Sequence, residues 1–215
     1  MSDTTGPIRA VVSDFGGVLT SPLHESFDAV ARQTNIPLEG LGKAMGRLAA
    51  EDGTHPLFEL ERGHLTEAEF IAAVEGALEQ EIGRRVSLAG LHEAYFQHLR
   101  TNEPMIDYLR EVRRRGLRLG LLTNNIREWE PRWRSMLPVD EIFHVVVDSA
   151  FVGMRKPERR IYEVTLELLE VEPAATVFID DLEINCEAAE ALGMTAVRFR
   201  TAEQAIEEIE AALTG

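Results

Sequence analysis

The sequence predicts an α/β protein built on a doubly wound parallel sheet, with a helical domain inserted into it. Three observations carry this prediction. Short segments rich in Val, Ile and Leu have the length and composition of buried strands. Helical patterns lie between the later segments, and one connection is far too long for a simple crossover. The predicted strands are residues 8–13, 117–123, 142–147, 176–180 and 195–199.

The segments between the later strands have the periodicity of amphipathic helices. In residues 102–116, Met105, Leu109 and Val112 recur at helical spacing on one face, and Gly116 ends the pattern. Two further segments, before and after the strand at 176–180, behave in the same way. Strands and helices that alternate in this manner predict a parallel sheet covered by helices on both faces.

The connection between the first two strands predicts a second domain. About a hundred residues separate them, where a dozen or so suffice for a crossover helix. This stretch contains several amphipathic blocks, and Thr66 with Glu69 forms the sequence pattern of a capping box. We therefore predict a core domain made of residues 1–20 and 101–215, and a helical cap domain made of residues 21–100.

Composition restricts the possible partners. The 215 residues are 45% hydrophobic and carry a formal net charge of −15, which repels nucleic acid and anionic membrane surfaces. No apolar run approaches the roughly 18–20 residues that a membrane span needs, and the first residues lack the pattern of a secretory signal. We expect a cytoplasmic protein without nucleic-acid or membrane partners, as a monomer or a homodimer. The single cysteine, Cys186, is expected to be a packed residue.

Polar residues gather where the predicted strands end. The carboxyl ends of parallel strands meet at one edge of a doubly wound sheet, and ligands bind there. Each of the first four strands is followed, at once or soon after, by chemically active side chains. These side chains are Asp14, Thr123, Asn124, Lys156, Asp180 and Asp181.

This set of side chains predicts a phosphoryl-transfer site. Three carboxylates that lie close together repel one another unless a cation holds them, and hard oxygen ligands suit Mg²⁺. A metal ion beside the ammonium of Lys156 and the hydroxyl of Thr123 would form a pocket for a phosphoryl group. A carboxylate that faces phosphorus, such as Asp14, would then act as a nucleophile and form an aspartyl-phosphate.

The same motifs resemble those of the haloacid dehalogenase-like (HAD) hydrolases. The likeness consists of an aspartate after the first strand, Thr-Asn after the next, a lysine before proline, and an Asp-Asp pair before a helix ending in glycine. It extends from Ile8 to about Phe199. The resemblance implies a Rossmann-like core with a helical cap, Mg²⁺ as cofactor, and a small phosphorylated molecule as substrate.

The resemblance also implies a role for each matching residue. Asp14 would be the nucleophile and a metal ligand, and the carbonyl of Gly16 a second ligand. Asp181 would bind the metal directly and Asp180 through water. Lys156 would act with Asp14 in catalysis and would hold the phosphoryl group together with Thr123 and Asn124. Asn185, on the following helix, would lie behind the metal ligands.

Gly16 departs from the pattern. Most phosphatases of the superfamily carry a second aspartate at this position, which protonates the leaving oxygen. Glycine still contributes its carbonyl but removes acid–base help, typically a factor of about 10² to 10⁴ in rate. His24 and Glu25, just beyond this motif, are the nearest candidates for a replacement acid.

Three functions are compatible with Gly16. The first is a phosphatase, for example of sugar phosphates, that either takes substrates with good leaving groups, such as an anomeric or acyl phosphate, or recruits an acid from the cap. The second is an enzyme that attacks carbon, either a dehalogenase or a phosphonatase that uses a cap lysine, for which Lys43 is the sole candidate. The third is a non-catalytic module that binds phosphate or regulates a partner. The acidic pair favours the first.

Two further features of the sequence each leave two interpretations open. Trp129 and Trp133 are spaced as on one helix face, which favours core packing or a contact with the cap. Gly63 lies in a predicted cap loop, where an ordinary turn is the simpler explanation and a close approach of backbone to ligand the alternative.

Overall fold

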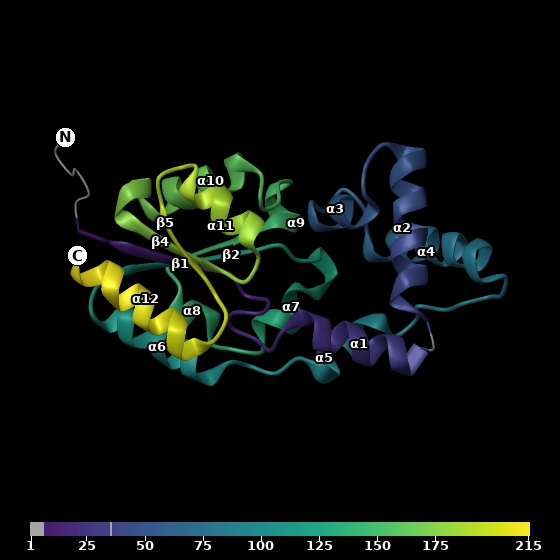
Figure 1. Ribbon diagram of the computed structural model, residues 1–215, viewed down its shortest axis with the longest axis horizontal. Helices are drawn as coiled ribbons and strands as arrows, with labels where there is room; N and C mark the ends of the chain where they lie inside the picture. Colours follow the sequence, from purple (N-terminus) through teal and green to yellow (C-terminus); the bar gives the residue numbers. More distant parts are fainter. Residues whose placement is uncertain (1–6, 35) are drawn as a thin grey trace.

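The computed structural model describes residues 7–34 and 36–215, and within them the chain forms a parallel sheet with helices on both faces (Figure 1). The strand order is β3-β2-β1-β4-β5, and all neighbouring strands are parallel. This is the predicted doubly wound α/β fold. The strands are β1 (Ala10–Ser13), β2 (Arg118–Thr123), β3 (Val145–Asp148), β4 (Thr176–Asp180) and β5 (Thr195–Arg198).

Alternation along the strands divides the apolar core between the two sheet faces. In β1, Ala10 and Val12 contact one core cluster, whereas Val11 belongs to the other. Successive side chains of a strand point to opposite faces, so a strand that is apolar throughout is buried on both sides. β1 is fully buried at every position and therefore lies at the centre of the sheet.

Helices cover each face of the sheet (Figure 1). On one face lie α6 (Glu103–Arg114), α8 (Val139–Ile142) and α12 (Ala202–Thr214), and on the other α10 (Arg159–Leu169) and α11 (Glu183–Glu190). Met105, Leu109 and Val112 form the buried face of α6, as their spacing predicts. The shorter elements are η1 (Arg127–Trp129), α7 (Glu130–Arg134), α9 (Ser149–Val152) and η2 (Pro173–Ala175).

The start of the third strand differs from the prediction. We expected a strand over 142–147, but Ile142 is the last residue of α8 and β3 begins at Val145. Pro138 precedes this helix, and its ring favours the first turn of a helix over a strand interior. Ile142 is fully buried in the core, so its apolar character reflects packing of a helix.

A helical insert leaves the core after β1 and returns before α6 (Figure 1). It contains α1 (Leu23–Thr34), α2 (Leu38–Asp52), α3 (Pro56–Glu61), α4 (Glu67–Ile82) and α5 (Leu91–His98). The predicted capping box is confirmed, because Thr66 and Glu69 exchange hydrogen bonds at the start of α4. The segment that enters the insert and the segment that leaves it lie side by side, joined by a β-bridge between Thr20 and Thr101.

No helix in the described parts of the chain has both the length and the apolar character that a membrane crossing requires.

Candidate active site

Three carboxylates meet where the strand order of the sheet reverses. Asp14 follows β1, Asp180 ends β4 and Asp181 comes next, and β1 and β4 are direct neighbours. One carboxylate oxygen from each residue lies within 4.8 Å of the others. The reversal between β1 and β4 is the switch point at which open α/β sheets bind ligands. The topology thus assembles residues that are more than 160 positions apart in the sequence.

Lys156 reaches this cluster from the segment between α9 and α10. Its ammonium nitrogen lies 2.6 Å from Oδ1 of Asp14 and 2.7 Å from Oδ2 of Asp180. The side chain is 2% exposed. Burial lowers the pKa of this lysine, but the carboxylates of Asp14 and Asp180 outweigh the effect and raise the pKa to about 12. Lys156 is therefore a fixed positive charge.

Asn124 holds the backbone of Lys156 in place. Its Oδ1 accepts a hydrogen bond from the Lys156 N–H at 2.8 Å, and its Nδ2 donates to the Lys156 carbonyl at 3.0 Å. Both bonds connect the end of β2 to the lysine segment, 32 positions away. Thr123, the last residue of β2, is buried at the same edge of the sheet. The structure thus brings all the predicted phosphoryl-binding side chains to one rim.

Asp180 is held rigidly by its neighbours. Its Oδ1 accepts hydrogen bonds from the Leu182 backbone N–H and from Nδ2 of Asn185, each at 2.9 Å, while Oδ2 accepts from Lys156. Asn185 therefore lies directly behind the acidic cluster, where the sequence predicted it. Cys186 is also buried here, and burial raises the pKa of its thiol to about 12, so the thiol stays protonated.

The cluster carries more negative than positive charge. Burial raises the pKa of Asp14 to about 7, opposed by the Lys156 ammonium and reinforced by the carboxylates of Asp180 and Asp181. Burial and Asp180 likewise raise the pKa of Asp181. One ammonium does not balance three carboxylates, and buried carboxylates that repel one another are relieved by a cation. The oxygen donors of this set suit a hard divalent ion such as Mg²⁺.

The loop after Asp14 brings its backbone against Asp181. Gly17 has a φ of +80°, and a Cβ at this position would lie 2.5 Å from Oδ2 of Asp181. A side chain here would meet both a strained backbone and the carboxylate itself. Gly17 is thus required for the compactness of the cluster, a role that the sequence motifs did not predict.

Gly16 is covered by the helical insert. A Cβ on Gly16 would lie 2.9 Å from Cδ1 of Leu23, at the start of α1. The space beside the site, where a second aspartate would project, is therefore occupied by an apolar side chain. Any group that protonates a leaving oxygen has to come from elsewhere.

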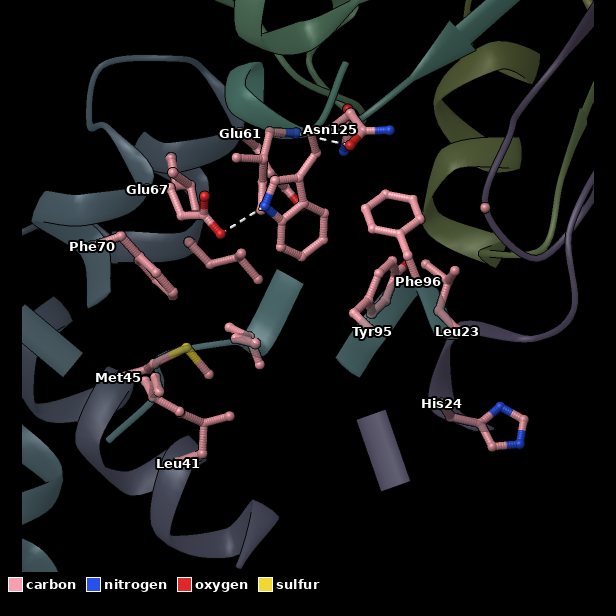
Figure 2. Close-up of a pocket in the computed structure, with 18 of the residues that line it drawn as sticks. Leu23, His24, Leu41, Met45, Glu61, Glu67, Phe70, Tyr95, Phe96 and Asn125 are labelled. Atoms are coloured by element: carbon pink, nitrogen blue, oxygen red, sulfur yellow. Dashed lines mark hydrogen bonds between the residues drawn. The ribbon is translucent and has the colours of Figure 1, made fainter. Parts of the chain in front are cut away.

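The two acids suggested by the sequence lie at the edge of this region. His24 is exposed, and in Figure 2 its ring points away from the centre of the cavity. Glu25 is exposed and forms an ion pair with Arg100 at 3.0 Å. His24 also belongs to the lining of the cavity in Figure 2, and a second hollow beside that cavity is lined in part by His24, Glu25 and Arg100.

A cavity of about 530 Å³ lies between the rim of the sheet and the helical insert (Figure 2). Gly16, Thr123, Asn124 and Asn125 line it from the core. From the insert its lining includes Leu23, Leu41, Met45, Phe70, Tyr95 and Phe96. Burial and the Asp14 carboxylate raise the pKa of Tyr95, so the phenol is neutral where the cavity approaches the acidic cluster. Sequence patterns showed the apolar faces of these helices but not the space between them.

The insert and the core are joined along one side of the cavity. Trp129 packs against Tyr95 and Phe96 of α5, with ring centroids 4.9 Å and 5.4 Å apart, and its indole donates to Glu67 at 2.7 Å. Trp133 is fully buried against Phe15, at a centroid distance of 5.3 Å. One tryptophan thus contacts the insert and the other packs in the core, in line with the expectation from their spacing.

The Gly63 loop makes a second junction. With a φ of +70°, Gly63 lies so close to the core that a Cβ would come within 2.2 Å of the Ala150 carbonyl oxygen. Gly63 therefore allows the backbone of the insert to approach the backbone of the core. Its role is a contact between the two parts of the chain, and the described lining of the cavity does not include it.

The fold and the site together define a class of protein. A doubly wound sheet with an acidic cluster and a buried lysine at its switch point is typical of α/β enzymes that bind a ligand beyond the carboxyl ends of their strands. The chain belongs to the haloacid dehalogenase-like hydrolases, because residues 8–193 match the sequence profile of that family.

Individual proteins resemble the chain over different shares of their length. Phosphatase MT3486 of Mycobacterium tuberculosis is 32% identical over 201 residues, which cover 88% of this chain and 86% of that protein. Acyl-CoA dehydrogenase family member 10 of Mus musculus is 30% identical over 212 residues, which cover 95% of this chain but 19% of that protein. The chain thus spans about a fifth of the length of the mouse relative.

A solved structure confirms the fold. The crystal structure of a HAD family enzyme from Bacteroides thetaiotaomicron, in complex with magnesium and inorganic phosphate, superimposes with a TM-score of 0.68. The two sequences are 24% identical, and the match covers 90% of this chain and 94% of the other.

Proposed function

We propose that this protein is a Mg²⁺-dependent phosphatase that cleaves a small organic phosphate through an aspartyl-phosphate on Asp14. The observation that carries the proposal is the contact between Asp14 and Lys156, at 2.6 Å, inside a cluster of three carboxylates. The name of the related phosphatase from M. tuberculosis and the ligands of the Bacteroides enzyme support the same chemistry. We further propose that residues 21–100 act as a cap over a core made of residues 1–20 and 101–215.

The donor set fits the metal. We propose that Asp14, Asp181 and the carbonyl of Gly16 hold Mg²⁺, with Asp180 acting through water. When bound, the ion would neutralise negative charge on the phosphoryl oxygens. Lys156 would neutralise charge on another oxygen, and the Thr123 hydroxyl would donate a hydrogen bond to the same group. Asn124 would orient Lys156 through the two backbone hydrogen bonds.

The chain itself provides the nucleophile. A carboxylate oxygen of Asp14 would attack phosphorus while the bond to the ester oxygen breaks, and water would later hydrolyse the resulting acyl phosphate. Gly16 and Leu23 leave no acid at the position where a second aspartate would lie. We therefore expect the rate of the first step to depend steeply on the pKa of the leaving alcohol.

The proposal is tested by phosphate release from p-nitrophenyl phosphate with and without Mg²⁺. We expect turnover with the metal, and a loss of about 10³-fold or more in kcat for Asp14→Asn, because the nucleophile is removed. Asp107→Asn is the matched control, since Asp107 is an exposed aspartate of α6 paired with Arg110. Mass spectrometry of acid-quenched enzyme should find one phosphoryl group on the peptide that contains Asp14.

Binding without turnover would reject the enzymatic proposal. If the protein binds inorganic phosphate and Mg²⁺ but releases no phosphate, even as Gly16→Asp, it is a binding module. For attack on carbon by way of a cap lysine, the structure offers no support: Lys43 is 61% exposed, pairs with Glu39 at 2.7 Å and is absent from the described cavity lining.

A further inference from the structure

We propose that the phosphorylated ligand of this site carries a long aliphatic chain, so that the substrate is the phosphate monoester of an aliphatic alcohol. The inference rests on the proposed phosphatase function and specifies its substrate class. It differs from the sugar phosphate that the sequence suggested, and the reason is the lining of the cavity. Because no acid lies at the Gly16 position, the alkoxide that leaves phosphorus would take its proton from water.

The walls of the cavity are apolar over most of their extent. In Figure 2, Leu41, Met45 and Phe70 face Leu23, Tyr95 and Phe96 across an open space. These residues come from helices α1, α2, α4 and α5, so the insert supplies most of the apolar wall. A sugar would place several hydroxyls against such walls, where they would lose hydrogen bonds to water without replacement.

Two of the three carboxylates in the described lining, Glu61 and Glu67, already have partners. Glu61 accepts from Arg155 at 2.6 Å, and Glu67 accepts from the Trp129 indole at 2.7 Å (Figure 2). A sugar site needs polar groups directed at the ligand, as binding pockets use a few such groups for orientation. Here Glu61 and Glu67 bind the core instead, which leaves Asp28 as the remaining carboxylate of the described lining.

The cavity is polar at the end next to the nucleophile. Gly16, Thr123 and Asn124 line it there, and Leu23 covers Gly16. A phosphate head at this rim would place its ester oxygen toward Leu23, and the chain beyond it would run between α2, α4 and α5. The polar and apolar ends thus match a head group and a tail.

The size of the cavity supports the same assignment. A volume of about 530 Å³ lies in the range of pockets that bury most of a ligand, roughly 300–1,000 Å³. An aliphatic chain would fill this space and remove its apolar surface from water.

The test compares substrates with similar leaving groups. Butyl, octyl and dodecyl phosphate and glucose 6-phosphate are all esters of primary alcohols, and p-nitrophenyl phosphate reports activity independently of the chain. We expect kcat/KM to rise about fourfold per methylene until the cavity is filled. Glucose 6-phosphate should be cleaved no faster than butyl phosphate.

A variant that narrows the cavity tests the location of the chain. Met45→Trp adds bulk on α2, and we expect it to lower the ratio of kcat/KM for dodecyl over butyl phosphate at least tenfold. Leu168→Trp, on the exposed side of α10, is the matched control and should leave that ratio unchanged. Circular dichroism and melting temperature establish that both variants fold.

Each outcome separates the two proposals. Turnover of p-nitrophenyl phosphate with a flat alkyl series would overturn the aliphatic substrate and leave the phosphatase intact. If no substrate turns over, the phosphatase proposal fails. Calorimetric measurement of dodecyl and butyl phosphate binding then tests whether the ligand is aliphatic. Dodecyl phosphate binding at least tenfold more tightly supports the aliphatic ligand, and equal binding refutes it.

Discussion

Two adjacent glycines after Asp14 have different roles at the scale of single residues. Gly17 combines a positive φ with close contact to Asp181, whereas Gly16 has ordinary backbone geometry and is limited by the Leu23 side chain. The sequence motifs assigned a role to Gly16, through its carbonyl, and none to Gly17. The distinction depends on Asp181, which is remote in sequence.

Gly17→Ala is expected to impair the site more than the fold. The strained φ should cost about 1–2 kcal/mol of unfolding free energy. The new Cβ would also displace the Asp181 carboxylate, so kcat on p-nitrophenyl phosphate should fall at least tenfold. Gly83→Ala is the control, because Gly83 has a φ of +72° and a Cβ there would meet no described atom within 4 Å. Equal activity of the two variants would contradict the role of Gly17.

At the scale of elements, the helical insert is attached to the segment that carries Lys156. Arg155 pairs with Glu61 at 2.6 Å, and Glu158 pairs with Arg62 at 2.5 Å. The Arg155 guanidinium also lies over the Phe58 ring, 3.9 Å from its centroid. Glu61 and Arg155 are both about five-sixths buried, so this pair is shielded from solvent more than an ordinary surface pair. The position of the insert is thereby coupled to the lysine.

Glu61→Gln is expected to loosen this junction. Loss of the charge leaves Arg155 without its ionic partner, at a cost of about 1–2 kcal/mol. Because the insert lines the cavity beside the site, kcat/KM for p-nitrophenyl phosphate should fall about five- to tenfold and proteolysis of the insert should become faster. Glu163→Gln removes an exposed pair with Arg159 on α10 and should change neither quantity measurably. An unchanged cleavage rate for Glu61→Gln would reject the coupling.

For the whole molecule, buried carboxyl groups make stability depend on pH. Asp148 ends β3 and caps α9, where its Oδ1 accepts from the Ala150 N–H at 3.0 Å. Burial raises the pKa of this group to about 7, although that hydrogen bond opposes the shift. Between pH 4 and 7 the folded state then binds more protons at Asp148 than the unfolded state does. Its contribution to stability therefore falls as the pH rises through this window.

Asp148→Asn should remove this dependence while keeping the capping oxygen. The free energy of unfolding of the variant, relative to the original protein, is expected to increase by roughly 2 kcal/mol from pH 5 to pH 8. Urea denaturation of both proteins at the two pH values measures this change in relative stability. Any effect of the amide that is independent of pH is the same at both values and cancels. A relative stability that stays constant over this range would show that Asp148 does not titrate as its burial predicts.

Local patterns explain why much of the fold was predictable. The capping box of Thr66 and Glu69 needs only neighbouring residues, and the buried strands were recognised from a few consecutive apolar side chains. The predicted start of β3 was wrong, because an apolar residue such as Ile142 fits a buried helix as well as it fits a buried strand. Periodicity over so few residues does not separate the two structures.

The sequence by itself determined the α/β core, the helical insert and the types of side chain at the carboxyl ends of the strands, because these follow from short-range periodicity and strand order. Only the tertiary structure decided how those side chains meet, with Lys156 between Asp14 and Asp180 and Asn124 bound to the lysine backbone. It also decided the apolar lining of the cavity. Apolar helix faces look alike in sequence whether they pack together or enclose space, and the difference lies in contacts between residues far apart in the chain.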